Sequence, residues 1–274
     1  MSGRERAAVN VSALHVFQIL RLISTASVPL GVAEISRRLD LPTSTVHRAL
    51  VTLERAQYLM RLETAPKYEL GPMPQFLARA LFRRFPLRAA SLPFLKQIAG
   101  ETGETTSLGV RIGWYQMRIA VAYGSNDLYS PGRLGETRLL HQDIAGRSIL
   151  AFLAQAELAR YRRHVEARHP ALLPQLDSQE LKLRDTRELG FAAESRDHGP
   201  GHAAVAVPLR DASGEAMAAI LVSGSVAPGK TGILKRPGWA KHVVALERQV
   251  RAVPEILAHS YLHLDPDEIT INLP

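Results

Sequence analysis

The sequence predicts an α+β fold in two domains, a small helical domain followed by a larger one that mixes helices with strands. Apolar residues recur at helical spacing in three segments before residue 57, and a short alternating segment follows them. From Thr105 onward, strand patterns and helix patterns alternate along the chain. The 274 residues, of which 46% are hydrophobic, are enough for two ordinary domains.

The first seventy residues predict three helices and a hairpin. Residues 12–24 form the first helix, with Ser12 as its N-cap. Its predicted apolar stripe is Leu14, Phe17, Leu20 and Ile23. Residues 31–39 form the second helix, and the turn DLP leads to a third, which Thr43 caps and which ends near Gln57. YLMRL and KYEL then alternate as two strands around the loop ETAP. This order is that of a winged helix-turn-helix.

A linker is predicted after the hairpin. PMPQFLARALFRR is amphipathic and basic, and LRAASLPFLKQIAGETG is a second helix that ends at Gly103. Pro86 lies between them at a predicted hinge. We therefore expect a DNA-binding-type domain at residues 10–71, a linker helix at 72–90 and a second domain at 91–264.

The second domain predicts a sheet with helices. TTSLGVRI and MRIAVAY read as strands, and PGRLGETRLL as an irregular loop. AGRSILAFL, QAELARYRRHVEARH and SQELKLRDTRELG are helical, the last closed by Gly190. FAAES, HAAVAVPLRD and EAMAAILVSG are strands, with ASGE as a hairpin turn. A helical stretch from Pro237, interrupted at Pro254, follows.

Composition excludes several classes of protein. Without cysteine, the chain has no disulfide, thiolate metal site or cysteine nucleophile. No apolar run approaches the roughly 18 residues of a membrane helix. The polar start MSGRERAAVN lacks the apolar segment of a signal peptide, so we expect a cytoplasmic protein.

Positive charge is concentrated in the first third of the chain. Residues 1–90 hold thirteen Lys and Arg against six Asp and Glu, whereas residues 91–274 hold twenty-one against twenty. Such asymmetry indicates a polyanionic partner for the charged part, although random surface charge is an equal alternative from charge alone.

The stretch LPTSTVHRAL carries the predicted DNA contacts. In a helix-turn-helix the second helix enters the major groove by its N-terminal residues. Short hydroxyls at Thr43, Ser44 and Thr45 allow close approach, and His47 and Arg48 can bond to bases or phosphates. Two hairpin residues, Arg61 and Lys67, can reach the flanking DNA backbone or the minor groove. The alternative for the hydroxyls is a helix cap plus two ordinary surface side chains.

At these residues the chain resembles the isocitrate lyase regulator (IclR) family of bacterial transcription factors. The pattern STVHRAL…L…YL…YELGP is similar to that of the family, and the likeness continues through ETGETTSLGV, LHQDIAGRSILAFL and VAVPLRDASGEAMAAILVSG. The resemblance implies a winged-helix domain, a linker helix and a GAF-like domain that binds a small organic effector. It also implies homodimers, often homotetramers, that bind double-stranded operator DNA, with no cofactor.

The resemblance also implies an effector pocket on the concave side of the sheet. The residues that match its positions are Ile144, Ala145, Glu194, Ala204, Leu221 and Ser223, with His141 before the pocket loop. The chain departs from the family at Ile144, where a small residue is common, and at Leu221, which replaces a hydroxyl. We therefore expect a narrower and more apolar pocket, and a larger or less polar ligand.

The remaining histidines and arginines have plain interpretations. For His141 a structural hydrogen bond is favoured over ligand contact. His198 and His202 flank Gly-Pro-Gly, which predicts a surface turn rather than a metal site. His164 and His169 are expected to be solvated, and Arg111, Arg133 and Arg138 to lie on the surface rather than to bind a ligand carboxylate.

Two other functions fit the sequence less well. An enzyme is disfavoured because the chain has no G-x-S-x-G, H-E-x-x-H, G-x-G-x-x-G or Walker motif, and the adjacency of residues in ESRDH does not make a triad. A ligand-independent architectural DNA-binding protein would explain the basic N-terminal third but not the large, nearly neutral second domain.

Overall fold

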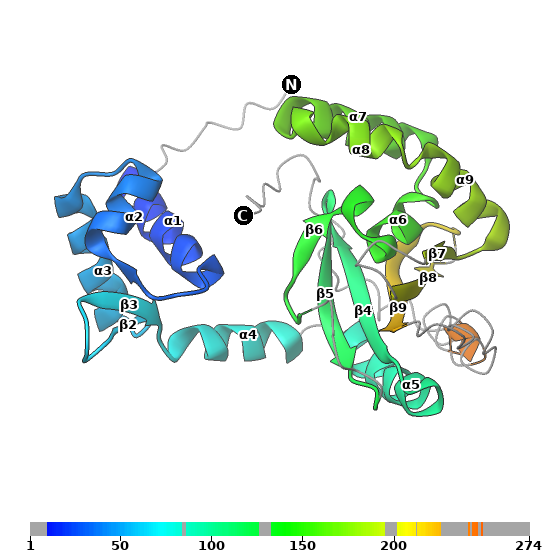
Figure 1. Ribbon diagram of the computed structural model, residues 1–274, viewed down its shortest axis with the longest axis horizontal. Helices are drawn as coiled ribbons and strands as arrows, with labels where there is room; N and C mark the ends of the chain where they lie inside the picture. Colours follow the sequence, from blue (N-terminus) through cyan, green and yellow to red (C-terminus); the bar gives the residue numbers. More distant parts are fainter. Residues whose placement is uncertain are drawn as a thin grey trace, which may run out of the picture. The chain divides into compact units, whose positions relative to one another are not determined.

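The computed structural model describes residues 10–83, 86–125, 133–194, 202–211 and 213–225, and positions 241, 243–245 and 248. The chain divides into two units, with the boundary between Arg83 and Arg84. Each unit is described by itself below, and Figure 1 shows the elements of both. The α+β fold class predicted from the sequence is confirmed.

Within its described residues, unit 1 contains four helices and a small antiparallel sheet. Its elements are α1 (Val11–Thr25), β1 (Leu30–Gly31), α2 (Val32–Leu39), α3 (Thr43–Arg55), β2 (Leu59–Arg61), β3 (Lys67–Leu70) and α4 (Met73–Arg83). The strand order is β1-β3-β2, so the predicted hairpin has a third, unpredicted strand at its edge. Residues from α1, α2, α3 and the sheet share one core, which includes Ile19, Ile35, Leu50 and Tyr68.

The first helix differs from its prediction in two ways. Its N-cap is Asn10, whose side-chain oxygen accepts a hydrogen bond from the backbone N–H of Ala13 (3.1 Å), so the assignment of Ser12 was wrong. Ile19 and Ile23 are buried, but Leu14 and Phe17 are 46% and 66% exposed. The packed stripe is therefore centred on a different face of α1, and an apolar face remains open.

The turn into α3 also differs. Asp40 ends α2 in the left-handed conformation (φ 52°), and Pro42, not Thr43, occupies the N-cap position of α3. The carbonyl of Pro42 accepts the first helical bonds, from the backbone N–H groups of Thr45 (2.9 Å) and Val46 (3.0 Å). No side chain caps this helix, so the assignment of Thr43 as the cap was wrong.

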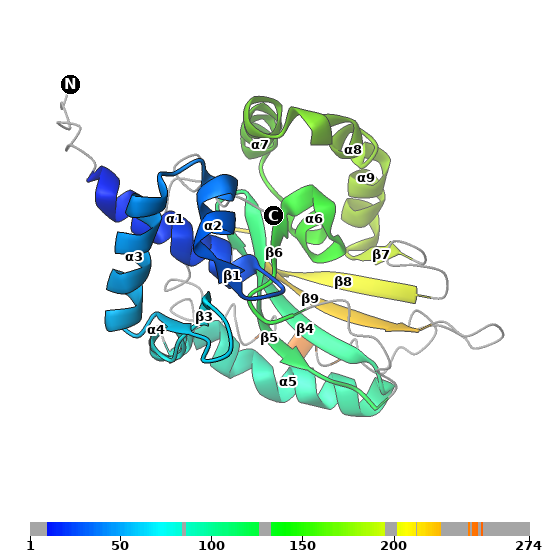
Figure 2. The same cartoon turned by 60° about the vertical axis from the view of Figure 1, so that its left-hand side comes forward.

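Unit 2 is a six-stranded antiparallel sheet with helices on both faces (Figure 2). The strand order is β6-β5-β4-β9-β8-β7. The strands are β4 (Thr105–Ile112), β5 (Tyr115–Ala122), β6 (Thr137–Leu139), β7 (Ala192–Glu194), β8 (His202–Arg210) and β9 (Ala216–Ser225). The helices are α5 (Pro86–Thr102), α6 (Ile144–Leu150), α7 (Gln155–Arg168), α8 (Leu173–Asp177) and α9 (Glu180–Leu189).

The helices of unit 2 divide between the two faces of its sheet. Helix α5 packs on β4 and β5, whereas α6 packs on β8 and β9 from the opposite side. The main core lies under α6 and includes Trp114, Ile144, Tyr161 and Leu221. Gly146 lets α6 approach closely, since a Cβ there would lie 2.4 Å from the carbonyl oxygen of Leu140.

Most predicted elements of unit 2 are confirmed, with local corrections. Gly190 closes α9 in the left-handed conformation (φ 80°), as predicted. The segment expected to be an irregular loop contains β6, which pairs with β5, and the short helix α8 was not predicted. The helical stretch expected from Pro237 lies mostly outside the described residues. No helix within the described part of the chain is long and apolar enough to cross a membrane.

Candidate functional site

The outward face of α3 presents the residues predicted to contact DNA. Val46, Ala49, Leu50 and Leu53 are buried and fix the helix to the core of unit 1. Thr43, Ser44, His47 and Arg48 are exposed, and Thr45 is half-buried. Helical periodicity thus divides α3 into a packed face and a polar face that begins at its free N-terminal turn.

The three hydroxyls at the front of α3 are available to a partner. Among the described residues, Thr43, Ser44 and Thr45 make no side-chain hydrogen bond, and Thr43 does not cap the helix. The alternative interpretation was a helix cap plus two surface hydroxyls, and the absence of a side-chain cap on α3 excludes the cap. Free hydroxyls next to the unpaired N–H groups of a helix start can donate to phosphate oxygens.

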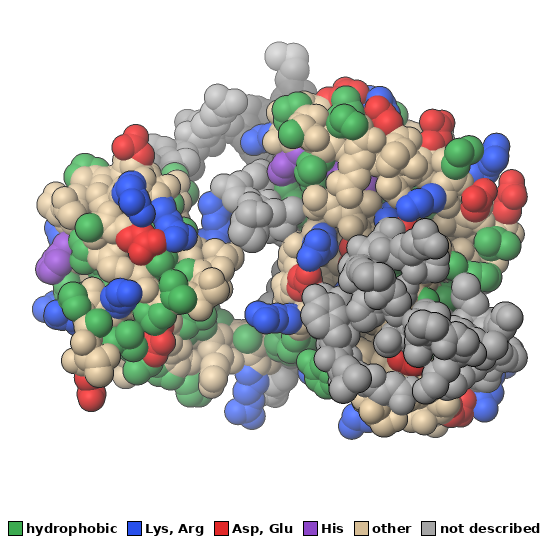
Figure 3. Space-filling model, viewed as in Figure 1, with side chains coloured by type: hydrophobic (Ala, Val, Ile, Leu, Met, Phe, Trp, Pro, Cys, Tyr) green, Lys and Arg blue, Asp and Glu red, His purple; other side chains and the backbone are tan. Residues whose placement is uncertain are grey.

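The hairpin places two further cations on the surface of unit 1. Arg61 is the last residue of β2, opposite the buried Tyr68, and Lys67 is the first residue of β3. Both are exposed and lie next to the loop that joins the strands. Basic side chains on the visible face of unit 1 are interspersed with acidic ones (Figure 3). On this face, the basic side chains of unit 1 therefore do not form one continuous basic surface.

Sheet register brings together three of the residues predicted to bind an effector. Glu194 of β7 pairs with Ala204 of β8, which pairs with Ser223 of β9. The row continues to Thr105 of β4, which pairs with Ser223. Leu221, two residues before Ser223, contributes to the buried core under α6.

Helix α6 supplies the other predicted residues. Ile144 and Ala145 are its first two residues, and both are 1% exposed within the same core cluster as Ala204 and Leu221. The side chain of Asp143 caps α6 by accepting a hydrogen bond from the N–H of Gly146 (2.8 Å). The start of α6 therefore packs against the row on β7, β8 and β9.

Glu194 is an anchored carboxylate. It forms an ion pair with the buried Arg147 of α6 and a second with Lys182 of α9, at 2.9 Å. A depression of about 130 Å³ beside it is lined mainly by α9 and β7, and Arg147 also borders it. The ion pairs with Arg147 and Lys182 neutralise Glu194, which therefore links β7 to α6 and α9 at the edge of the predicted pocket.

His141 is buried just before α6 and bonds to Tyr161 of α7. The Tyr161 hydroxyl accepts from the backbone N–H of His141 (3.1 Å) and lies 2.5 Å from its ring Nδ1. Burial, and then the charges of His169 and Arg147, lower the pKa of His141 to about 4. The neutral ring therefore accepts the hydroxyl hydrogen at Nδ1 and carries its own hydrogen on Nε2.

The Nε2 atom of His141 has no hydrogen-bond partner among the described residues. Leaving a buried donor unpaired costs about 1–3 kcal/mol. His141 thus has the structural hydrogen bond favoured from the sequence and, in addition, one donor that a ligand acceptor can satisfy.

Several residues expected on the surface are buried instead. Arg111 is 7% exposed and pairs with Glu157 (2.6 Å) and Glu215 (3.2 Å), so its assignment to the surface was wrong. His164 is 7% exposed, with its ring against Trp114, so the expectation that it is solvated was wrong. The burial of Arg111 and of His164 depends on partners that are distant in the sequence.

The remaining arginines and histidines singled out in the sequence contact protein groups or lie outside the described residues. Arg138 is exposed and pairs with Glu136 (2.8 Å), which also accepts from the backbone N–H of Arg133. His169 is half-buried and lies 3.4 Å from the Tyr115 hydroxyl. His198 lies outside the described residues, as do the ESRDH residues after Glu194. Within the described part, no group of three His, Asp or Glu residues could hold a metal ion.

Sequence reasoning missed the buried Arg118 on β5. Its guanidinium pairs with Glu136 (3.1 Å) before β6 and with Asp143 (3.6 Å), the cap of α6. Arg118 therefore holds the segment from Glu136 to the start of α6 against the sheet. An arginine within an otherwise apolar strand, MRIAVAY, was the signal for a buried ion pair.

Comparison with known proteins gives consistent matches to both units. The family model described as "IclR helix-turn-helix domain" matches residues 12–63, and "Bacterial transcriptional regulator IclR C-terminal" matches residues 79–231. The HTH-type transcriptional regulator BhcR of Paracoccus denitrificans is 31% identical over 212 residues, which are 77% of this chain and 76% of that protein.

Two further matches extend the comparison. The HTH-type transcriptional repressor AllR of Escherichia coli K12 is 27% identical over 212 residues, 75% of this chain and 77% of that protein. The crystal structure of the Thermotoga maritima IclR superposes with a TM-score of 0.64 at 25% identity, over 92% of this chain and 99% of that chain.

Proposed function

This chain belongs to the IclR family of bacterial transcriptional regulators, and on that premise we propose that it is a sequence-specific DNA-binding repressor controlled by a small organic effector. Its relatives are named as transcriptional regulators, one of them as a repressor, and not as enzymes. Unit 1 binds the operator DNA, and unit 2 binds the effector. We expect the protein to act in the cytoplasm.

The observation that carries the proposal is the free polar face of α3. Thr43, Ser44 and Thr45 offer unbonded hydroxyls, and His47 and Arg48 follow on the exposed side. Arg48 is placed to bond guanine O6 and N7 or a phosphate, and Arg61 and Lys67 to contact the flanking backbone. Because the buried face of α3 is packed in the core, these groups reach the DNA as one rigid set.

The regulator acts as a homodimer or as a homotetramer. Two copies would place their α3 helices in successive major grooves roughly 34 Å apart, on an approximately palindromic operator. Exposed apolar side chains on α1 and α4 support self-association: Val11, Leu14, Phe17, Phe76 and Leu77 are each 46–66% exposed.

The effector site lies between the start of α6 and the row on β7, β8 and β9. Ile144, Ala145, Ala204 and Leu221 supply its apolar part. Polar groups come from Ser223, Glu194 and His141, whose Nε2 can donate a hydrogen bond. This composition fits an effector that is mainly apolar and carries one hydrogen-bond acceptor.

The effector changes operator affinity by favouring one spacing of the two α3 helices. We assign the DNA-binding domain to residues 10–71, the linker to 72–90 and the effector domain to 91–264. A ligand shifts the equilibrium between two spacings of the α3 helices only by its difference in affinity for them. A tenfold change in operator affinity corresponds to a difference of about 1.4 kcal/mol.

Fluorescence anisotropy tests the proposal. The purified protein is titrated into DNA from upstream of its own gene and into a scrambled duplex of equal length, across a salt series. A clear preference for the native sequence supports a specific regulator. Equal, steeply salt-dependent binding to both duplexes would contradict it and favour the architectural alternative, because phosphate contacts alone carry no sequence information.

A further inference from the structure

A buried arginine on β5 connects two elements that border the proposed effector site. Arg118 is 5% exposed, and its guanidinium lies between the carboxylates of Glu136 and Asp143. The contact with Glu136 is a hydrogen bond at 3.1 Å, whereas Asp143 is 3.6 Å away and makes only an ion pair. One side chain thus holds both the residue before β6 and the residue before α6.

The backbone of Arg118 joins the same segment. Its N–H donates to the carbonyl of Glu136 (2.9 Å), and its carbonyl accepts from the N–H of Gly135 (2.8 Å). The antiparallel pairing of β5 with β6 therefore continues as far as Arg118. Because its backbone and its side chain bind the same residues, a shift of Arg118 moves the segment before β6 with it.

Asp143 has two roles at the start of α6. Its Oδ1 caps the helix by accepting from the N–H of Gly146 (2.8 Å), and its Oδ2 faces Arg118. Ile144 and Ala145, two of the proposed effector contacts, follow it directly in the chain. A ligand that displaces the first turn of α6 therefore displaces Asp143 as well. Separating two buried charges is costly, so this displacement acts on Arg118.

The residue after Arg118 forms a β-bulge. The register of β5 with β4 moves from Ala120 directly to Arg118, so Ile119 has no partner residue on β4. The carbonyl of Ile119 accepts a hydrogen bond from Nε of Arg88 (2.9 Å), the third residue of α5. Since α5 and α6 lie on opposite faces of the sheet (Figure 2), this part of β5 connects them through it.

Helix α5 begins where the chain enters unit 2. The boundary between the two units lies just before its first residue, Pro86. Arg88 therefore lies within the proposed linker, residues 72–90. A contact at Arg88 is thus a contact with the part of unit 2 that leads to the DNA-binding domain.

From these contacts we propose that Arg118 and Arg88 are positioning residues that couple the effector site to the linker. This inference rests on the proposed function, because it takes the start of α6 as part of the effector site. The route runs from Asp143 to Arg118, along the backbone to Ile119, and from the Ile119 carbonyl to Arg88. The longer Asp143 contact allows a second arrangement, in which the guanidinium moves closer to Asp143 and away from Glu136. The effector favours one arrangement by binding it more tightly.

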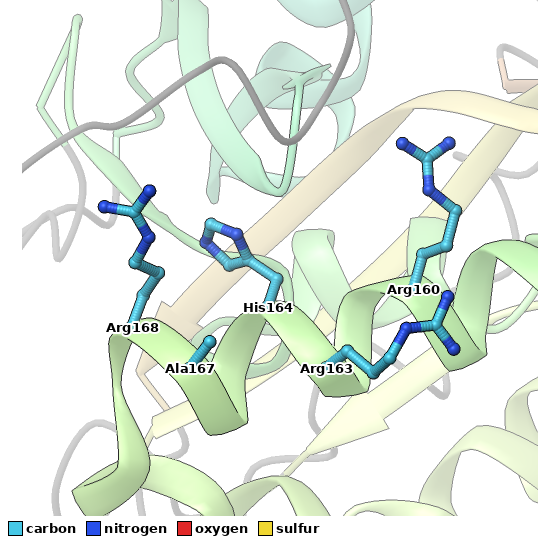
Figure 4. Close-up of a pocket in the computed structure, with 5 residues that line it drawn as sticks. All are labelled: Arg160, Arg163, His164, Ala167 and Arg168. Atoms are coloured by element: carbon cyan, nitrogen blue, oxygen red, sulfur yellow. The ribbon is translucent and has the colours of Figure 1, made fainter.

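Two exposed arginines of unit 2 provide matched controls. Arg138 also pairs with Glu136 (2.8 Å), but its side chain is 48% exposed. Arg163 lines an open depression on α7 with Arg160 and Arg168, and their guanidinium groups point in different directions (Figure 4). Arg138→Met and Arg163→Met each remove one positive charge from unit 2 and leave the route from α6 to α5 intact.

Hydrogen exchange of the full chain, without DNA or ligand, tests the coupling in both directions. Asp143→Asn keeps an oxygen that can cap α6 but removes the charge that pairs with Arg118. It should speed exchange in the first turns of α5 by about threefold or more, because loss of the ion pair loosens the bulge. Arg88→Met should speed exchange in α6 to a similar extent, since coupling between two sites is reciprocal. Both controls should exchange as the wild type does.

Arg118→Lys tests the central residue of the route. Lysine keeps the charge, so the buried carboxylates retain a cation and the variant should fold, but an ammonium lacks the planar fork that contacts both. Exchange should rise in α5 and α6 together.

Operator binding gives a readout that a purely structural role would not change. Arg118→Lys and Arg88→Met should each alter operator affinity in the anisotropy assay by about threefold or more, and the double variant should show no larger effect, because both act on one route. A residue that only stabilises unit 2 would lower the melting temperature and leave the operator affinity of the folded protein unchanged.

The results separate the coupling from the proposed function. The coupling is overturned if exchange rises only next to each substitution, if it rises equally across the whole sheet, or if the controls behave as the variants do. It is also overturned if Arg118→Lys and Arg88→Met bind the operator as the wild type does. If the wild type itself does not prefer the operator to scrambled DNA, the proposed function fails, and the exchange experiment still decides the coupling.

Discussion

Removal of the Tyr161 hydroxyl tests the packing that holds the start of α6. In Tyr161→Phe the phenyl ring can keep its contact with Trp114, whose ring centre is 5.5 Å away. The variant loses the two contacts to His141, one to its backbone N–H at 3.1 Å and one to Nδ1 at 2.5 Å. Both His141 groups are then buried without a partner, because His141 is 0% exposed.

The expected loss of stability follows from those two groups. Each buried polar group left unpaired costs about 1–3 kcal/mol, so the free energy of unfolding of unit 2 should fall by about 2–4 kcal/mol after partial relaxation. Urea denaturation, followed by circular dichroism and tryptophan fluorescence, measures this loss. Tyr123→Phe is the matched control, since Tyr123 is 67% exposed and loss of its hydroxyl should change stability little.

A loss of stability below about 0.5 kcal/mol in Tyr161→Phe, or one equal to that of Tyr123→Phe, would contradict this role of the hydroxyl. It would mean that water or another group satisfies His141 in place of the hydroxyl. Tyr161 would then not anchor the segment before α6.

Four further predictions concern the DNA contact, the effector site, the close approach of α6 and pH. Arg48→Ala should weaken operator binding by about 1–3 kcal/mol if Arg48 reads a base, whereas equal weakening on scrambled DNA would reveal a phosphate contact. Ser223→Leu should abolish the ligand response and leave operator binding intact; retained induction would remove Ser223 from the site. Gly146→Ala should destabilise unit 2 by about 1–3 kcal/mol, because its Cβ would meet the Leu140 carbonyl at 2.4 Å, whereas Gly100→Ala, with open space around it, should be neutral or stabilising in the same denaturation assay. The pKa of His141 is lowered from 6.5 to about 4 on folding, so the unfolded chain binds the proton more tightly. The stabilisation is complete above about pH 6.5 and decreases towards pH 4, by at most about 3 kcal/mol, and His141→Asn should reduce this slope in urea titrations at several pH values.

Local sequence patterns predict most of the element order and the exposed face of α3. Local spacing decides which side of a helix is apolar, so Val46, Ala49 and Leu50 could be assigned to the core without a structure. Gly190 could likewise be assigned to the end of α9, since its left-handed conformation is a local requirement. The departures from the family pattern at Ile144 and Leu221 were also readable in the sequence.

Tertiary contacts, by contrast, set which polar residues are buried and which residues form a site. Arg111 is buried because Glu157 and Glu215, 46 and 104 positions away, neutralise it. Glu194, Ala204 and Ser223 become neighbours through strand register, and β6 is a strand because β5 is there to pair with it. Leu14 and Phe17 remain exposed although their spacing is helical, because the core meets a different side of α1. The physical reason is common to these cases. Periodicity and turn preferences arise from interactions within a few residues, whereas burial of charge, strand pairing and pocket shape depend on groups that only folding brings together.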